Sequence, residues 1–292
     1  MKRPAGTVRG FARFYIIFVL AVMYVPILLV IIYSFNQNRQ SAQWGGLSLH
    51  WYRELFRDRA LFEALLNSLV LGLLSSFCAA IIGVLAASGM TRARLPGAKS
   101  IELLAILPII TPEIIMGMVS MAFFAFLSLP FGMLTLVIAH TTMCIPYVFL
   151  LVKARLEGID KSLAEAAQDL GAGEWRAFYD ITLPLLMPAI VSGLLISFAM
   201  SFDDVIISIF VTGVNTNTLP IKIYTQLKVG VTPKINALCT LLFVLTALLS
   251  LCSAVISGYG SHSRGNSRPK IVIKKDHPRN LPESGDGSIC SV

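Results

Sequence analysis

Hydrophobic residues along this chain gather in long runs that polar residues seldom interrupt. Several of these runs reach the roughly 20 residues that an α-helix needs to cross a hydrocarbon layer about 30 Å thick. The pattern predicts an all-α polytopic membrane protein with about six transmembrane helices. The predicted spans are Phe14–Ser34, Leu66–Ser88, Ile101–Leu127, Met133–Val152, Leu186–Phe210 and Ala237–Tyr259.

The composition agrees with a membrane protein. The 292 residues are 55% hydrophobic and 14% charged, with a mean hydropathy of +0.74, whereas soluble domains carry about 25% charged residues. The first run follows a basic stretch, as in a secretory signal, but it is too long and no small-residue cleavage site follows it, so we expect a retained span. The cysteines stand singly, without metal-ligand or CxxC spacing, and are expected to pack as small apolar residues.

The net charge of +8 is distributed unevenly between the predicted loops. If both termini are cytoplasmic, 17 of the 24 Lys and Arg residues fall in inner segments and the other seven in outer segments. This bias agrees with the positive-inside rule, so the basic balance reflects topology and does not indicate nucleic-acid binding. We therefore expect residues 1–13 to form a cytoplasmic N-terminus, 14–260 a transmembrane domain and 261–292 a disordered cytoplasmic tail, because the tail is rich in Ser, Gly, Pro and charge.

Two connections between the predicted spans are longer than tight turns. The outer segment Asn36–Leu65 carries Trp44, Trp51 and Tyr52, which suits a short helix at the headgroup level. The inner segment 153–185 contains helix formers. Ser162 can cap the start of a helix together with Glu165 three positions later, and a glycine can end that helix.

This inner loop contains a spaced pattern at residues 160–184. Its landmarks are Glu165, Ala166, Ala167, Gly171, Ile181, Leu183 and Pro184. The two alanines leave a helix face small enough for a partner to approach closely, and the glycine permits the backbone to turn out of the helix. The Leu-Pro pair is expected to mark the start of the next span, since a residue before proline disfavours the α region.

The pattern resembles the EAA loop of binding-protein-dependent importer permeases, in which EAA is followed at fixed spacing by G and by I-x-LP. The resemblance implies the type I importer permease fold and a coupling role for the loop. Further stretches resemble the polyamine branch of this family, among them PEIIMG at Pro112, SFDDVIIS at Ser201 and LPIKIY at Leu219. The resemblance covers about 24–248.

From this resemblance we expect a subunit of the bacterial cytoplasmic (inner) membrane that has no catalytic residues and binds no cofactor or metal itself. The implied partners are a second permease chain, two ATPase subunits that carry ATP and magnesium, and an extracytoplasmic polyamine-binding protein. The implied function is translocation of spermidine or putrescine, and the alternative within the same class is another small solute.

Acidic residues within the spans are the most direct indication of a substrate. Each costs roughly 2.5–3.5 kcal/mol at the bilayer centre on insertion scales. Asp203 and Asp204 fall in the fifth span, and Ser197, Ser201, Asp204 and Ser208 have the spacing of one polar helix face. These carboxylates are candidates for a cation pathway, with a hydrogen-bond network or an ion pair to the partner permease as the structural alternative.

Three other residues are weaker candidates. Glu113 follows Pro112 in the third span and either lines a cavity or meets a partner arginine. Trp51 outside the membrane contacts a docked protein or a passing amine, or it is an interfacial anchor. His140 in the fourth span is expected to be a hydrogen-bonded packing residue rather than a ligand.

Other classes of protein fit the sequence less well. A phosphate-binding GxxxxGK[ST] motif is absent, as are HExxH and GxSxG, so neither ATP hydrolysis nor a membrane-embedded enzyme is indicated. A secondary transporter that moves a proton on Asp203 or Asp204 would have no role for the EAA loop.

Overall fold

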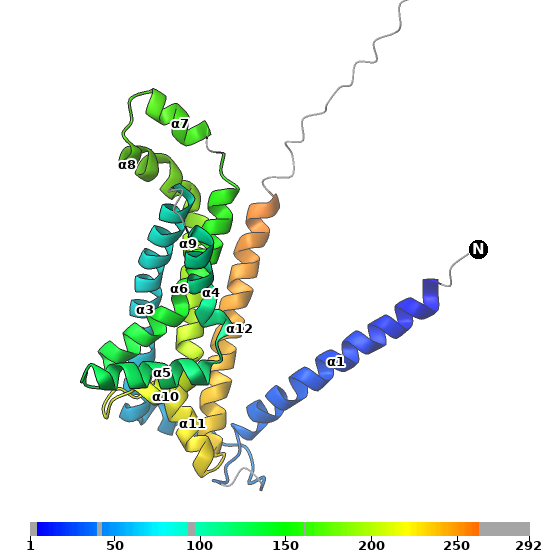
Figure 1. Ribbon diagram of the computed structural model, residues 1–292. Helices are drawn as coiled ribbons and strands as arrows, with labels where there is room; N and C mark the ends of the chain where they lie inside the picture. Colours follow the sequence, from blue (N-terminus) through cyan, green and yellow to red (C-terminus); the bar gives the residue numbers. More distant parts are fainter. Residues whose placement is uncertain (1–4, 40–42, 93–96, 161, 263–292) are drawn as a thin grey trace, which may run out of the picture. The chain divides into compact units, whose positions relative to one another are not determined.

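The computed structural model describes residues 5–39, 43–92, 97–160 and 162–262, and the side chains of 249–262 lie outside that description, as does the whole predicted tail from 263. The described chain is almost entirely helical, apart from one isolated bridge between Asn36 and Leu47 (Figure 1). It divides into two compact units, Met1–Leu241 and Leu242–Val292.

Four helical stretches are long and apolar enough to cross a membrane. The first is α1 (Ala5–Tyr33), the next are α3 (Arg59–Arg92) and α6 (Met133–Glu157), and the last runs continuously from Glu174 to Asp203. The last stretch comprises α8 (Glu174–Ala177), the π-helical segment η1 (Phe178–Thr182) and α9 (Leu183–Asp203). These stretches coincide with the first, second, fourth and fifth predicted spans.

The third predicted span, Ile101–Leu127, is not a single helix. The structure has α4 (Ala98–Ile110) and α5 (Glu113–Phe126), which meet at an angle of 107°. Thr111 is extended, with φ −77° and ψ 131°, because the residue before a proline avoids the α region and Pro112 has no N–H to continue the helix. The described residues thus contain four long apolar helices, or five spans if the bent pair is taken as one.

The fifth predicted span, Leu186–Phe210, is also interrupted. After α9, Asp204 adopts an extended conformation with ψ 128°, and the short helix α10 (Ile206–Val211) follows. A further helix, α11 (Leu219–Val229), precedes α12 (Pro233–His262), which carries the sixth predicted span. The apolar character of α12 is described as far as Leu248.

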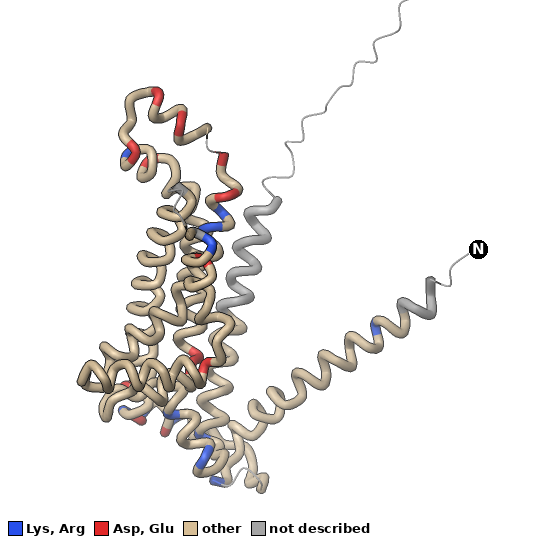
Figure 2. Tube along the Cα trace, viewed as in Figure 1, with Lys and Arg blue, Asp and Glu red and all other residues tan. Residues whose placement is uncertain are grey.

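The core of the first unit lies between α3, α6 and α9. Val148 and Phe149 on α6, Leu71 on α3 and Leu186 on α9 are fully buried there. The helices approach closely at a glycine, because a Cβ on Gly193 would lie 3.1 Å from the Cα of Val148. In this bundle, charged residues lie mainly toward its two ends, with a small acidic group between them (Figure 2).

Candidate coupling loop and intramembrane polar site

Glu165, Ala166 and Ala167 of the EAA pattern lie in a short helix whose described neighbours include α8 and η1. The helix α7 (Ser162–Asp169) has no buried residue among those described. Ser162 is its first residue rather than its cap, and the backbone N–H of Ser162 donates to the Asp160 carboxylate at 3.0 Å. That hydrogen bond lowers the pKa of Asp160 below its ordinary value. The expected capping role of Ser162 is therefore taken over by Asp160.

The end of α7 follows the prediction for Gly171. Its φ is +89°, a conformation that L residues rarely adopt. The Gly171 N–H donates to Gln168 at 2.8 Å, and the Ala172 N–H donates to Ala167 at 3.0 Å. This pair of bonds is a Schellman motif, which satisfies the last carbonyl groups of the helix and turns the chain away.

Leu183 and Pro184 do not interrupt the helix, contrary to the expectation for a residue before proline. Leu183 is α-helical, with φ −61° and ψ −45°, and its N–H donates to Phe178, five residues back. A π-helical turn thus directly precedes Pro184. It supplies the extra residue that lets the proline ring pass without a clash with the preceding turn. The last part of the coupling loop, from Glu174, and α9 are consequently one continuous helix.

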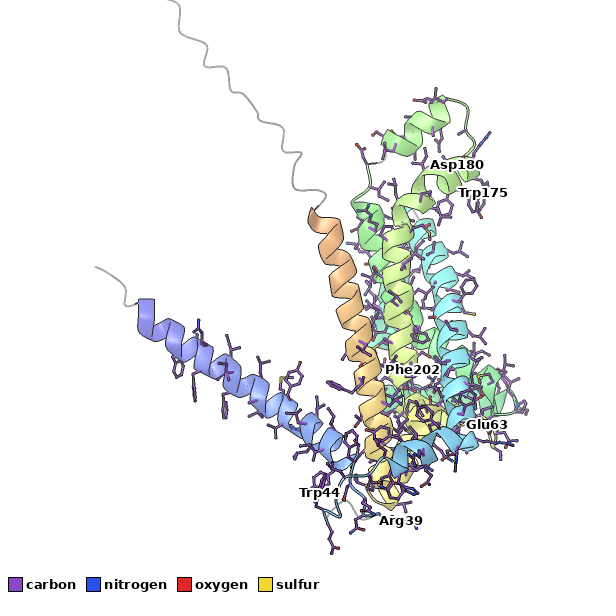
Figure 3. All side chains as sticks on the ribbon, turned by 180° about the vertical axis from the view of Figure 1, so that it is seen from behind. Arg39, Trp44, Glu63, Trp175, Asp180 and Phe202 are labelled. Atoms are coloured by element: carbon purple, nitrogen blue, oxygen red, sulfur yellow. The ribbon has the colours of Figure 1, made fainter. Side chains whose placement is uncertain are left out.

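Large apolar side chains are exposed around this loop. Leu170 is 90% exposed and Trp175 is 75% exposed, and Trp175 and Asp180 lie at the end of the bundle opposite Arg39 and Trp44 (Figure 3). A pocket of about 290 Å³ lies beside them. It is lined by Ala167, Leu170, Gly171, Ala172, Arg176, Ala177, Asp180 and Ile181. Sequence reasoning missed Leu170 and Trp175, although large apolar residues in a predicted cytoplasmic loop were a visible signal.

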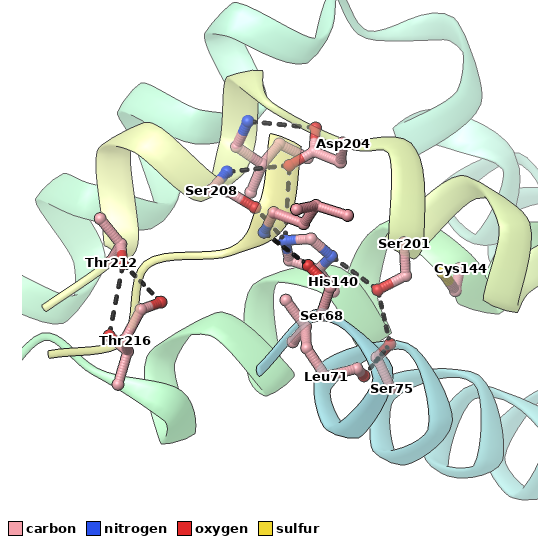
Figure 4. A network of polar contacts seen from close by, with 12 residues as sticks. Ser68, Leu71, Ser75, His140, Cys144, Ser201, Asp204, Ser208, Thr212 and Thr216 are labelled. Carbon is pink, nitrogen blue, oxygen red and sulfur yellow. Dashed lines mark hydrogen bonds and ion pairs between the residues drawn. The ribbon is translucent and has the colours of Figure 1, made fainter. Parts of the chain in front are cut away.

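A buried polar network connects four helices at the end of α9 (Figure 4). His140 on α6 is fully buried. Its Nδ1 hydrogen-bonds with the Ser201 hydroxyl at 2.8 Å, and its Nε2 with the Ser208 hydroxyl at 3.0 Å. Ser75 on α3 donates to Ser201 at 2.9 Å. His140 is therefore a hydrogen-bonded interior residue, as predicted, but it also has an acidic neighbour that the sequence did not indicate.

That neighbour is Asp204, whose Oδ2 lies 3.4 Å from His140 Nε2. The Asp204 carboxylate also accepts the backbone N–H groups of Ile207 at 3.2 Å and Ser208 at 2.9 Å. Asp204 is buried, whereas Asp203 beside it is exposed. The structure thus places Asp204 and Ser201 in the network that was the structural alternative, and leaves Asp203 on the surface of the bundle.

Glu113 is the first residue of α5, directly after the break at Pro112. Its side chain is exposed. A carboxylate in the first turn of a helix is favoured by the helix dipole, so Glu113 tolerates its position without an internal cation. The expected proline-broken helix is present here.

Trp51 lies in α2 (His50–Arg57), which is the short helix expected in the outer segment. It is buried, with 8% exposure, and its indole N–H donates to the Asn36 carbonyl at 2.8 Å. This placement gives Trp51 a local structural partner. Trp44, at 51% exposure, and Phe56, at 78%, are accessible aromatic residues of the segment.

An ion cluster ties α2 to the first turn of α12. Lys234 Nζ lies 2.9 Å from Asp58 and 3.1 Å from Glu54. Partial burial opposes ionisation of Asp58, but the hydrogen bond from Lys234 and a backbone bond from Leu61 outweigh it and lower the pKa of Asp58. Burial likewise opposes the charge on Lys234, yet the two carboxylates raise its pKa. Asp58 and Lys234 therefore stay charged near neutral pH.

The structure brings Ser201 and Asp204 together, and it separates both from the coupling loop and from Trp51. Within the described residues, no group of three or more His, Cys, Asp or Glu side chains forms a metal site. The candidate sites are thus a surface loop at one end of the bundle and a polar interior at the break between α9 and α10.

The described chain is a bundle of apolar helices with interrupted segments and an exposed loop helix. The family described as binding-protein-dependent transport system inner membrane component matches residues 79–262, and the chain belongs to this family. Its members are transport permease subunits, not enzymes.

Among curated proteins, the chain is 38% identical to the spermidine/putrescine transport system permease protein PotC of Haemophilus influenzae. The match covers 87% of this chain and 99% of that one. It is 39% identical to the putrescine transport system permease protein PotI of Escherichia coli strain K12, over 75% of this chain and 81% of that one.

Among solved structures, a bacterial ABC transporter that imports the acidic polysaccharide alginate superposes with a TM-score of 0.66 at 14% identity. The superposition covers 89% of this chain and 99% of that one. A second structure of an alginate transporter, in complex with a periplasmic protein bound to an alginate pentasaccharide, gives 0.65 at 18% identity, over 87% and 93% of the two chains. These similarities show the fold, which is that of ABC importer permeases.

Proposed function

We propose that this chain is a permease subunit that moves polyamines, spermidine or putrescine, across the bacterial cytoplasmic membrane. The observation that carries the proposal is the 38% identity to a polyamine permease over nearly the whole length of that relative. In this proposal a second permease chain completes the pathway, two ATPase subunits bind ATP and magnesium, and an extracytoplasmic protein delivers the polyamine.

Asp203 and Glu113 are the carboxylates that we assign to the pathway. Both are exposed on the first unit, and each stands next to a break in a membrane helix. Polyamines are flexible polycations, so a pathway needs negative charge that is accessible and is not already neutralised. Asp204 and Ser201 support this arrangement from the interior, because their polar groups already have partners in the chain. Trp51 has a corresponding supporting role in the outer loop.

The EAA loop is assigned to coupling with the ATPase. Glu165 and Ala166 are exposed on α7, and the exposed Leu170 and Trp175 flank the pocket beside it. An apolar patch of this kind on a loop helix is typical of a protein contact. Because the helix from Glu174 continues into α9, a displacement of the loop by the ATPase is transmitted along this helix toward Asp203.

The test is ATP-dependent uptake by the assembled complex. We would co-express the chain with the second permease and the ATPase, reconstitute the complex in liposomes with the binding protein, and measure uptake of labelled spermidine and putrescine. We expect uptake that requires ATP and the binding protein and that survives a proton ionophore. Uptake of another solute but of neither polyamine would defeat the cargo assignment, and uptake driven by a pH gradient without ATP would favour a secondary transporter.

A further inference from the structure

The break between α9 and α10 occurs without a helix breaker. No Pro or Gly stands between Met200 and Val211, yet α9 ends at Asp203 and α10 begins at Ile206. Breaks within apolar helices need an identifiable cause, such as proline, glycine or a polar group inserted into the hydrogen-bond ladder. Here the inserted group is the Asp204 carboxylate, which accepts the N–H groups of Ile207 and Ser208 at the start of α10.

His140 contacts both sides of this break. Its Nδ1 meets Ser201, on the last turn of α9, and its Nε2 meets Ser208 on α10 and lies 3.4 Å from Asp204. The ring is fully buried, and Ser75 of α3 supports its α9 side through Ser201. A rigid imidazole that is bonded to both helices from a third helix fixes their relative position.

The position of the break decides the surroundings of Asp203. If α9 continued for one more turn, Asp204 would lose its two backbone donors, and a buried carboxylate without partners is strongly unfavourable. The network therefore keeps the buried and the exposed carboxylate distinct, although the two are neighbours in the sequence. None of the described residues gives the side chain of Asp203 a hydrogen bond or an ion pair.

We propose that His140 is a positioning residue for transport: it holds the α9–α10 break and thereby keeps the Asp203 carboxylate exposed to the cationic cargo. This inference rests on the proposed polyamine transport, and it gives Asp203 and Asp204 different tasks. Asp203 contacts the cargo, and Asp204 forms the buried contact with His140 that holds the break in place.

Two substitutions distinguish the contacts of Nδ1 from those of Nε2 in the His140 ring. In His140→Gln the side-chain amide can reach the place of Nε2 and still donate to Asp204 and Ser208, whereas in His140→Asn it reaches only the place of Nδ1. We expect His140→Asn to lower the uptake rate about fivefold and His140→Gln to stay within about twofold of wild type. Thr142→Val is the matched control on α6, since the Thr142 side chain is exposed and bonds only to its own helix at Ile138.

A double-mutant cycle tests whether His140 acts through Asp203. If it does, His140→Asn should lower uptake by less than about twofold when Asp203 is already Asn, because the group that it positions is gone. Equal losses in both backgrounds would overturn the proposal, as would equal effects of Asn and Gln in complexes that assemble normally. If His140→Asn does not accumulate, Ser208→Ala is put through the same cycle with the same criteria. Failure of the wild-type complex to transport any polyamine is a separate result that defeats the proposed function instead.

Discussion

At the scale of single residues, the adjacent carboxylates Asp203 and Asp204 show what a sequence leaves undetermined. Their position within an apolar run indicated that they serve more than packing, and the Asp204 carboxylate does accept two backbone hydrogen bonds. The sequence pattern placed Asp204 on one polar helix face, directed to a pore or to another helix, because a continuous helix puts Ser197, Ser201 and Ser208 on the same face. The structure keeps these serines buried together with Asp204, but the helix breaks and the stripe faces His140. His140 is on another helix, 64 positions before Asp204, and such a distant neighbour leaves no periodic signal in the sequence.

Asp203→Asn removes the charge but keeps the volume of the side chain. We expect uptake of spermidine or putrescine to fall at least about tenfold, equivalent to about 1.4 kcal/mol, because the exposed carboxylate is the proposed counter-charge for the cargo. Basal ATP hydrolysis by the reconstituted complex should persist, since the coupling loop is unchanged. Normal polyamine uptake in this variant would remove Asp203 from the pathway.

Asp204→Asn is the informative comparison at the neighbouring position. Its amide retains one acceptor for the two N–H groups of α10 and loses the negative charge beside His140. We therefore expect a lower yield of assembled complex and a lower melting temperature, which Asp203→Asn should not produce. A stable Asp204→Asn complex with a cargo-specific transport defect would contradict the division of tasks.

At the scale of helices, the existence of the elements could be predicted and their interruptions only in part. Apolar run length located the spans, and Gly171 marked the end of the loop helix. Pro112 was recognised as a break, because a proline has a local conformational effect that a sequence displays. The π-helical turn before Pro184 was missed, since a proline is accommodated either by ending a helix or by adding a residue to a turn, and the packing of Phe178 and Thr182 decides between them.

Gly171 offers a test of the loop that is free of steric ambiguity. No heavy atom lies within 4 Å of a Cβ placed there, so a substitution is opposed by the positive φ alone. Gly171→Val should cost roughly 1–2 kcal/mol of loop conformation, whereas Asn tolerates this region more readily. We expect Val to lower the polyamine transported per ATP hydrolysed about fivefold, and Asn to stay within about twofold of wild type.

The Gly171 comparison is made on complexes reconstituted in equal amounts, with ATP hydrolysis and uptake measured together. Membrane insertion should be normal in both variants, because the loop lies outside the spans. Unchanged coupling in Gly171→Val would mean that the turn after α7 is not required for transmission, and the coupling role of the loop would then lose its structural basis.

At the scale of the whole chain, one helical loop pattern and the apolar runs together led to the family, which the comparison over residues 79–262 then established. The sidedness of the protein rests on the distribution of basic residues. Within the first unit, Trp175 and Asp180 lie at the opposite end from Arg39 and Trp44 (Figure 3). Gly230 and Arg39 line one pocket of about 980 Å³, so they share an end.

This arrangement makes a definite prediction for reporter fusions. Since 17 of the 24 Lys and Arg residues fall in the segments assigned to the inside, the positive-inside rule places Gly173 and the tail in the cytoplasm. Fusions at Gly173 and in the tail should be active with a cytoplasmic reporter, and fusions at Gln43 and Gly230 with a reporter that folds outside. A tail that reports outside while Gly173 reports inside would mean that only one of the two long helices after Gly173, α9 or α12, crosses the membrane. Reversed signals at all four sites would preserve the fold but invert the protein, and the exposed face of α7 would no longer be accessible to a cytoplasmic ATPase.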